Sequence, residues 1–288
     1  MHPTFHNKAL QTEFLKNGFV IIPSLLDILD IRKLLNVFVQ YQQEYSSSFH
    51  ASHFSSNIAY KKAAHHAIAS IVFAKAEPYL CDYVPLFGNF MVKGPNTNTS
   101  LETHTDWTYL DEGQYNSVAI WLPLIDVNLE NGCLGIIKSS HRITNSIRGP
   151  RIEESSRKKN EYWAKKYGTL LNMKAGDAVF YHHGLLHFSP SNKTNEIRPA
   201  INLTVVPKEA ECLHYCIPEG ASEIELYAVD GPDFYLNYNN FQRPETNSLI
   251  NKIPPHFVKF LDERMKNFAI KRYFMDIKSY VHPKGWIS

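Results

Sequence analysis

The sequence predicts a mainly β protein, a sandwich or barrel, with helical additions before and after the strands. Three observations lead to this fold class. Between about residues 84 and 207 the chain is a series of short β-rich runs separated by turn residues, without the long helices that βαβ units need between strands. Hydrophobic residues make up 44% of the 288 residues, enough for a sizeable core. The expected strands are 86–93, 115–124, 132–138, 169–173, 177–182 and 198–206.

The region before residue 84 is predicted to be mainly helical, because its apolar residues recur at helical spacing. Ser24, which follows Pro23, is the expected N-cap of the second helix. The expected elements are helices over 9–18, 24–45 and about 60–79, a short buried strand over 18–23, and a loop over 46–57.

Turn residues and polar stretches punctuate the rest of the chain. Asn131-Gly132 predicts a hairpin, and Ala175-Gly176-Asp177 predicts a turn that leads into a strand. Residues 142–166 are polar and of mixed charge, which favours a surface excursion or a lid. After Pro207 we expect an aromatic-rich irregular stretch, and then a helix over 254–275.

No linker, repeat or low-complexity tract divides the chain, so one domain over 1–288 is the simplest organisation. It would consist of a helical N-terminal part over 1–83, a β core over about 84–207 and a C-terminal extension over 208–288. Nothing in the sequence indicates an oligomeric state.

Composition excludes several classes of partner. The net charge of +2 gives no electrostatic reason to expect binding to nucleic acid or to an anionic membrane. We expect no membrane span, since no apolar run is long enough. Four cysteines in so long a chain do not indicate a disulfide framework, and no signal peptide is evident. The expected location is cytoplasmic.

The residues that carry chemistry begin with His104 and Asp106. In an extended segment, side chains two residues apart point to the same side. One imidazole and one carboxylate on one face are two thirds of the facial triad that holds non-haem Fe(II) and leaves coordination positions open. The third ligand would be a histidine from another strand, and His182, His183 and His187 are candidates. Arg198 could then hold the far end of a dicarboxylic acid bound at the iron.

Seven ordered motifs resemble the phytanoyl-CoA dioxygenase family. They are Phe14-Leu15-Lys16-Asn17-Gly18-Phe19-Val20-Ile21-Ile22-Pro23; His104-x-Asp106; Trp121-Leu122-Pro123-Leu124; Glu130-Asn131-Gly132-Cys133-Leu134; Ser139-Ser140-His141-Arg142; Gly176-Asp177-Ala178-Val179-Phe180; and His187-x-Ser189-x-x-Asn192 with Arg198. The resemblance covers about residues 10–206. One departure is Ser139, where the family often has glycine; this should affect a turn and not the chemistry.

The resemblance implies an iron(II)- and 2-oxoglutarate-dependent dioxygenase on a double-stranded β-helix, a jelly roll related to the cupins. It implies that His187 completes the iron site with His104 and Asp106. Fe(II), 2-oxoglutarate as cosubstrate and O2 would be used to hydroxylate an unactivated C–H bond, with release of succinate and CO2. The residues expected to contact the cosubstrate are Arg198, Ser189, Lys93, Asn89 and Trp121; those expected near the substrate are Trp107, Tyr109 and Tyr181.

Other interpretations remain. A non-enzymatic cupin-like metal- or ligand-binding protein is the main alternative, although it need not keep all the ligands together with Arg198. Halogenases of this scaffold replace the carboxylate ligand, so Asp106 disfavours that reaction. Histidines 50, 53, 65 and 66 are expected at the surface, and a zinc site around His214 is not favoured. The substrate could be a small molecule or be tethered to a carrier, and a partly apolar small metabolite is favoured.

Overall fold

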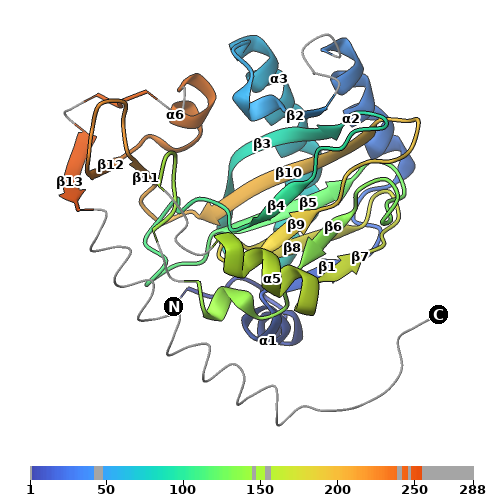
Figure 1. Cartoon of the computed structure of the whole chain (residues 1–288), viewed down its shortest axis with the longest axis horizontal. Helices are drawn as coiled ribbons and strands as arrows, with labels where there is room; N and C mark the ends of the chain where they lie inside the picture. The colour runs from blue at the N-terminus through green and yellow to red at the C-terminus, as the bar shows by residue number, and fades with distance from the viewer. Residues whose placement is uncertain are drawn as a thin grey trace.

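The strands form two facing antiparallel sheets, as a jelly roll requires (Figure 1). The computed structural model describes residues 2–41, 48–144, 147–152, 157–238, 242–245 and 248–254. The larger sheet has six strands in the order β1-β8-β5-β10-β3-β2, and the smaller has four in the order β4-β9-β6-β7. The mainly β, double-stranded β-helix prediction is therefore confirmed.

Each of the six predicted β-rich runs coincides with a strand, and so does the strand expected over 18–23, whereas β2, β4 and β9 lie outside the predicted runs. The larger sheet consists of β1 (Phe19–Ile22), β2 (Phe49–Ala51), β3 (Tyr83–Lys93), β5 (Val118–Pro123), β8 (Ala178–His182) and β10 (Arg198–Pro207). The smaller consists of β4 (Leu101–His104), β6 (Leu134–Ile136), β7 (Thr169–Leu171) and β9 (His187–Ser189).

The central strands of the larger sheet are apolar on both faces because both faces are covered. One face packs against helices, through Ile120, Phe180 and Ile201. The opposite face, which includes Trp121 and Tyr181, packs toward the smaller sheet. Period-2 alternation therefore gives way to continuous hydrophobic runs, as expected for doubly covered strands. These inward-facing positions also border the site described below.

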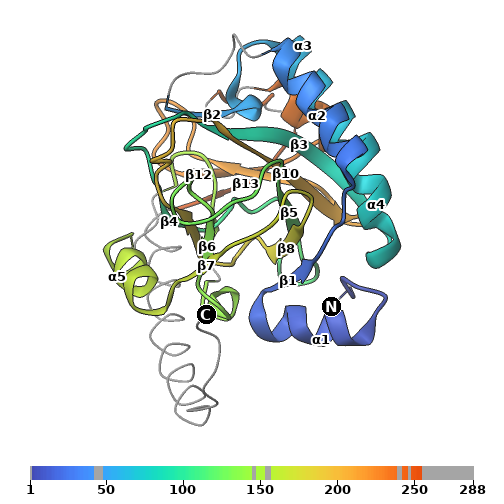
Figure 2. The same cartoon turned by 90° about the vertical axis from the view of Figure 1, so that its right-hand side faces the viewer.

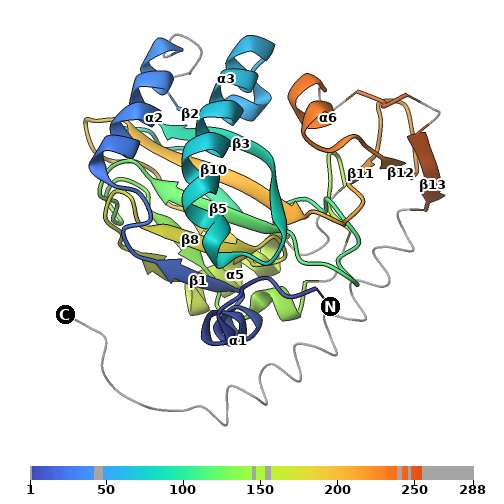
Figure 3. The same cartoon turned by 180° about the vertical axis from the view of Figure 1, so that it is seen from behind.

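The helices come mainly from the N-terminal part, as predicted. In Figure 3, α2 and α3 lie over the larger sheet, and Figure 2 places α5 on the other side of the molecule. The α-helices are α1 (Lys8–Asn17), α2 (Ile28–Gln40), α3 (Ile58–Ile68), α4 (Ala74–Ala76), α5 (Arg157–Tyr167) and α6 (Gly231–Asn237). Short 3-10 or π turns are η2 (Ser52–Phe54), η3 (Ala69–Phe73), η4 (Glu77–Tyr79) and η5 (Ser140–Arg142).

Three local predictions were wrong. Asp27, not Ser24, caps α2, because its carboxylate accepts the N–H groups of Leu29 and Asp30 at 2.8 and 2.9 Å. The expected loop over 46–57 contains β2 and η2 within its described part. The turn at Gly132, with φ +81°, joins no hairpin, since β6 pairs with β7 and β9. Local turn chemistry predicts a reversal of the chain but not the partner of the next strand.

The described part of the C-terminal extension is mostly a small antiparallel sheet. It contains β11 (Leu213–Cys216), β12 (Ile224–Ala228) and β13 (Leu249–Ile253), with α6 beside it. The aromatic residues that predicted irregular structure instead pack inward: the Tyr235 ring lies 5.3 Å from Tyr109 and 5.4 Å from Phe87. The helix expected over 254–275 lies outside the described residues beyond its first position.

Gly18 ends α1 in the left-handed region, with φ +83°, and is tightly packed. A Cβ there would lie 2.4 Å from His141 Nδ1 and 2.7 Å from Leu185, whereas a Cβ at Gly220, φ +75°, would meet nothing within 4 Å. Gly220→Ala should cost about 1–2 kcal/mol of unfolding free energy from backbone strain alone. Gly18→Ala should cost roughly 1–3 kcal/mol more from overpacking. Denaturant unfolding tests this, and equal losses at the two positions would contradict it.

Candidate active site

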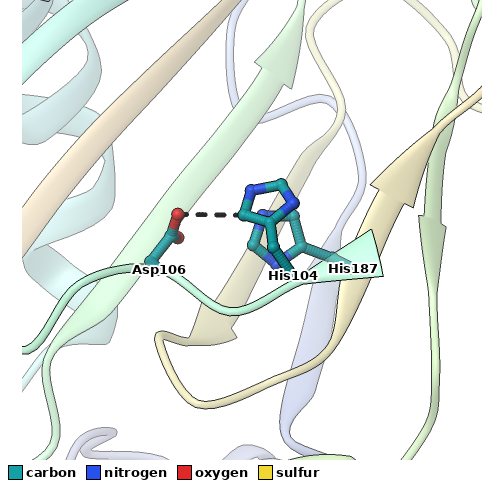
Figure 4. A group of neighbouring side chains, drawn as sticks. All are labelled: His104, Asp106 and His187. Atoms are coloured by element: carbon teal, nitrogen blue, oxygen red, sulfur yellow. Dashed lines mark ion pairs between the residues drawn. The ribbon is translucent and has the colours of Figure 1, made fainter. Parts of the chain in front are cut away.

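His104 and His187 lie opposite each other on neighbouring strands. They are direct partners in the β4–β9 register, and their ring centroids are 4.3 Å apart. Asp106 follows β4 by two residues, and its Oδ1 lies 3.7 Å from His187 Nε2. One ligand atom from each of the three side chains falls within 4.8 Å of the others (Figure 4). Among the described residues, this is the group of three placed to hold a metal ion.

The two imidazoles are oriented by backbone carbonyls. His104 Nδ1 lies 2.6 Å from the carbonyl oxygen of Glu102, and His187 Nδ1 lies 3.0 Å from that of Leu185. A hydrogen bond to a carbonyl requires the proton on Nδ1, so the Nε2 lone pair of each ring remains for a metal. Burial, together with nearby His104, lowers the pKa of His187 to about 4, which keeps this ring neutral.

The carboxylate of Asp106 also fits a cation. Burial acts to raise its pKa, but the three surrounding histidines (His187, His183 and His104) and a hydrogen bond from Tyr181 together act in the opposite direction, and the net pKa is lowered. The half-buried side chain is therefore ionised. Its Oδ2 has no hydrogen-bond partner. A bound cation would compensate that charge, and two neutral imidazoles with one carboxylate suit Fe(II).

The two rival histidines lie outside this group. His182 Nδ1 accepts the N–H of Gly184 at 2.8 Å, so its ring is used in a local turn. The His183 ring is fully buried beside Tyr109, at a centroid distance of 5.2 Å. The backbone carbonyl of His183 accepts the Asp106 N–H at 2.9 Å, so this residue supports the loop that follows β4 and carries Asp106.

Two buried cations lie side by side near the iron ligands. Arg198 and Lys93 are direct partners in the β10–β3 register, and they are 2% and 0% exposed. Lys93 Nζ donates to the carbonyl oxygens of Ser189, at 3.0 Å, and Pro190. Arg198 Nη1 donates to the Met91 carbonyl at 3.2 Å, while its Nε has no partner. Within the described part of the chain no carboxylate pairs with either cation, and burying two unpaired cations is costly unless an anion joins them.

The remaining predicted cosubstrate residues surround Arg198. The guanidinium lies 5.9 Å from the Trp121 ring centroid. Ser189 is buried, and its hydroxyl donates to the Gly132 carbonyl at 2.9 Å. Gly132 is required here, since a Cβ would lie 2.6 Å from the Pro190 carbonyl oxygen.

Two connected cavities meet at His104 and Asp106. A small chamber extends from the three metal-binding side chains to Arg198 and is also lined by Trp121, Tyr181, Ser189, Leu134, Phe188, Met91, Leu101 and Asn202. A larger cleft, of about 240 Å³, opens on the other side. It is lined by Phe49, Ala51, His53, Phe54, Phe87, Asn89, Met91, Leu101, His104, Thr105, Asp106, Trp107, Tyr109, Asn202 and Thr204. The chamber therefore joins the candidate metal-binding side chains to the buried guanidinium of Arg198.

Three of the predicted contact residues do not line the cavity expected for them. Lys93, expected at the cosubstrate, lines neither cavity, although it lies beside Arg198 on the neighbouring strand. Asn89, expected at the cosubstrate, lines the cleft and is absent from the chamber. Tyr181, expected at the substrate, lines the chamber, with its ring 4.9 Å from that of His187. The two cavities share one face of β10, since Arg198 lines the chamber, Asn202 lines both and Thr204 lines the cleft. The position of a residue along its strand therefore decides which cavity it borders. Trp107 and Tyr109 line the cleft, as expected for substrate-side residues.

Three residues that matter for the site were missed. Arg148 and Glu161, from the stretch predicted to be a surface excursion, hold the strand and loop of the iron ligands. His53, predicted at the surface, is 8% exposed and stacks on Phe87 at 4.6 Å. The surface prediction was also wrong for His65, which is 6% exposed and accepts the Gly88 N–H at 3.1 Å. No local pattern distinguished these side chains from solvated ones, because their partners are far away in the sequence.

Comparison with known proteins decides the family. The phytanoyl-CoA dioxygenase family profile matches residues 14–200, more than half of the chain. The chain belongs to this family. A phytanoyl-CoA dioxygenase of Arabidopsis thaliana is 28% identical over 123 residues, and the human peroxisomal phytanoyl-CoA dioxygenase is 31% identical over 113 residues. These alignments cover 42% and 37% of this chain, and only 43% and 32% of those two relatives.

Solved structures give the same fold at lower identity. The 2-oxoglutarate-dependent carbocyclase SnoK from nogalamycin biosynthesis matches 74% of this chain and 90% of its own, with a TM-score of 0.53 and 18% identity. HygX from Streptomyces hygroscopicus, solved with nickel and 2-oxoglutarate, matches 70% of this chain and 88% of its own, with a TM-score of 0.51 and 13% identity. Both matches support the jelly-roll fold of the family.

Throughout the described ranges, no helix combines the length and the apolar character that crossing a bilayer requires.

Proposed function

We propose that this chain is an iron(II)- and 2-oxoglutarate-dependent dioxygenase that hydroxylates an unactivated C–H bond of a small molecule. The observation that carries the proposal is the common boundary of two cavities. His104 and Asp106 line both the chamber, which ends at Arg198, and the aromatic cleft. A dicarboxylate in the chamber and a second molecule in the cleft would therefore meet at one metal ion.

The proposed reaction balances as 2-oxoglutarate, O2 and R–H giving succinate, CO2 and R–OH. When bound, Fe(II) supplies the redox chemistry that couples oxidation of the keto acid to oxidation of the C–H bond. His104, Asp106 and His187 would hold the iron on one face and leave the other face open. Arg198 and Lys93 would bind the far carboxylate of 2-oxoglutarate, which orients the keto acid toward the iron.

The decisive experiment measures succinate formed from 2-oxoglutarate by purified protein with Fe(II), ascorbate and O2. Succinate formed without the molecule to be hydroxylated, by uncoupled turnover of 2-oxoglutarate, is sufficient for a positive result. Under anaerobic conditions, the same protein should show the visible charge-transfer band of Fe(II) chelated by 2-oxoglutarate. A protein that shows neither the band nor succinate would instead favour the non-enzymatic cupin-like alternative.

Lys93 should make 2-oxoglutarate binding depend on pH. Burial, together with the Arg198 guanidinium, lowers the pKa of Lys93 to about 7, despite an opposing effect of Cys133. The charged amine is needed for the carboxylate, so affinity should be full below pH 7 and fall as the pH rises. We expect the KM for 2-oxoglutarate to increase about tenfold between pH 7 and pH 8.5.

Lys93→Met provides the control for this pH dependence. It should bind 2-oxoglutarate more weakly at pH 6.5 but with little further change up to pH 8.5. An equally steep pH profile in Lys93→Met would assign the titration to another group.

A further inference from the structure

The walls of the cleft are mainly aromatic. The Phe54 and Trp107 rings meet edge to face at 6.3 Å, and Phe87 lies between His53 and Tyr109, at 4.6 and 5.4 Å. Phe54 is 58% exposed, so it stands at the mouth, whereas Phe87 is buried. Such a surface favours flat or branched apolar groups.

The described lining of the cleft contains no lysine or arginine. His53 and Tyr109 are the titratable groups of the described lining apart from the metal ligands, and burial raises the pKa of Tyr109, so its hydroxyl is neutral. The His53 ring is neutral as well, because its burial, followed by repulsion from Lys61 and His214, lowers its pKa to about 3. The guanidinium of Arg198 lines the chamber, and Lys93 is its buried cross-strand partner. An anionic group in the cleft would thus lose its hydration and gain no counter-charge.

Apart from His53 and the metal ligands, the polar groups of the described cleft lining are amides and hydroxyls. Asn89 and Asn202 are direct cross-strand partners, and the Asn89 amide donates to the Asn202 backbone carbonyl at 3.2 Å. The Asn202 side-chain Oδ1 is buried without a partner. Thr204 lines the cleft two residues further along β10. These groups can hydrogen-bond a neutral hydroxyl, ester or amide.

From these observations we infer that the substrate class is an uncharged small molecule with an aromatic or branched apolar body and a neutral hydrogen-bonding group. A free carboxylate or a coenzyme A thioester would not bind better than the corresponding neutral compound. This inference rests on the proposed function, because the cleft is taken as the substrate site.

The test presents the same aromatic and branched-alkyl acids in three forms: methyl ester, free acid and coenzyme A thioester. Binding is measured as a perturbation of the anaerobic Fe(II)–2-oxoglutarate band, and turnover as stimulated succinate release. At least one ester should perturb the band, with an affinity about tenfold or more above that of its free acid. Phe54→Arg should shift the preference toward the free acid, whereas the control Phe54→Leu should not.

The outcomes separate the two levels of the proposal. If the band does not form, the proposed function fails. If the band forms but no ester perturbs it, or the acid or the thioester binds as tightly as the ester, the substrate class is wrong.

Independent contacts lead to a second inference, which concerns residues 147–152 and 157–167. Arg148 is 3% exposed, and its Nε donates to the backbone carbonyl of the iron ligand Asp106 at 2.6 Å. Its Nη1 and Nη2 bind both carboxylate oxygens of Glu112, at 3.0 and 2.5 Å. Two further hydrogen bonds join Arg148 to Thr108. The Thr108 N–H donates to the Arg148 carbonyl oxygen, and the Arg148 N–H donates to the Thr108 hydroxyl. One arginine therefore fixes the ligand loop at three residues.

Glu161 acts on the strand before that loop. It projects from α5, and its carboxylate accepts the backbone N–H of Thr103 at 2.7 Å. Thr103 immediately precedes the iron ligand His104 on β4, a strand at the edge of the smaller sheet. Glu161 therefore satisfies a backbone donor on the side of β4 that has no neighbouring strand.

We propose that Arg148 and Glu161 are positioning residues for the iron site. Arg148 would set Asp106 through its backbone carbonyl, and Glu161 would set His104 through its strand. The segment would thus serve as a brace for two of the three ligands, in place of the predicted lid. Supports of this kind affect metal affinity without contacting the metal.

The test measures the dissociation constant for Fe(II), or for Co(II) as a redox-stable substitute, in Arg148→Lys and Glu161→Ala. Lysine cannot bind the carbonyl and both Glu112 oxygens at once. We expect metal binding to weaken about 10- to 100-fold, with 2-oxoglutarate affinity at saturating metal changed less than about threefold. Glu161→Gln keeps an acceptor and should restore most of the affinity.

Arg151→Lys, at an exposed position of the same segment, is the matched control and should leave metal affinity unchanged. The thermal midpoint of each metal-free variant reports any general loss of folding. Unchanged metal affinity in both Arg148→Lys and Glu161→Ala would overturn the proposal. The proposal would also be overturned if the fall in thermal midpoint of the metal-free variants accounted for the whole loss of metal affinity.

Discussion

Asp106→Ala is expected to reduce succinate formation by at least about 10³-fold, or about 4 kcal/mol of transition-state stabilisation. The variant removes one of three ligands and the only negative charge among them, and leaves two neutral imidazoles that bind Fe(II) weakly. Metal titration and anaerobic charge-transfer spectroscopy provide the measurement. Both should show loss of iron binding before any effect on 2-oxoglutarate can be seen.

The structure supplies a control for charge removal. Asp126 is an exposed carboxylate that pairs with Lys174 at 2.8 Å, away from the site. Asp126→Asn should retain iron binding and turnover. Iron binding at wild-type affinity in Asp106→Ala would refute the assignment of this carboxylate.

Arg198→Met should separate binding of 2-oxoglutarate from binding of iron. Loss of a buried charged partner costs about 2–5 kcal/mol, which corresponds to roughly 30- to several-thousand-fold in the KM for 2-oxoglutarate. Iron affinity should change little, because Arg198 lies at the far end of the chamber. Succinate formation at varied 2-oxoglutarate concentrations, together with metal titration, measures the two effects.

The same substitution should not destabilise the protein without ligand. Arg198 lies beside Lys93, burial lowers its pKa to about 10, and a methionine of similar length removes one of two neighbouring buried cations. We expect the unfolding free energy of the metal-free variant to equal or exceed that of wild type, a trade of stability for function. Arg198→Lys, which keeps the charge but loses the planar fork, should show an intermediate KM. A KM within threefold of wild type in Arg198→Met would place the cosubstrate elsewhere.

The sequence predicts most of the fold because its strands obey local rules. The runs that became β3, β5, β8 and β10 are apolar and bounded by turn residues, and nothing distant was needed to recognise them. The helix near residue 28 was also recognised, but its cap was assigned to the wrong residue. Ser24 and Asp27 are both good caps, and the path of the chain into the helix decides between them.

The candidate site divides in a similar way. The spacing of His104 and Asp106, together with the order of the motifs up to Arg198, predicted the residues that the structure brings together. The positions of Asn89 in the cleft and of Tyr181 in the chamber could not be predicted, because they depend on where along each strand the two cavities lie. The burial of His53 depends on β2 and η2, in a stretch that was predicted to be a loop.

By itself, the sequence determined the fold class and pointed to the three side chains that the structure places together as a candidate metal site. The fold class follows from the local pattern of apolar residues. The candidate residues follow from the spacing of the histidine and carboxylate side chains and from the order of the motifs. Only the tertiary structure decided that a charged stretch braces the iron ligands, and that the cleft carries no fixed cation in its described lining. The physical reason is that burial and hydrogen-bond partners are properties of packed surfaces. For Arg148 and Asp106, the contact joins residues 42 positions apart, and no local pattern encodes it.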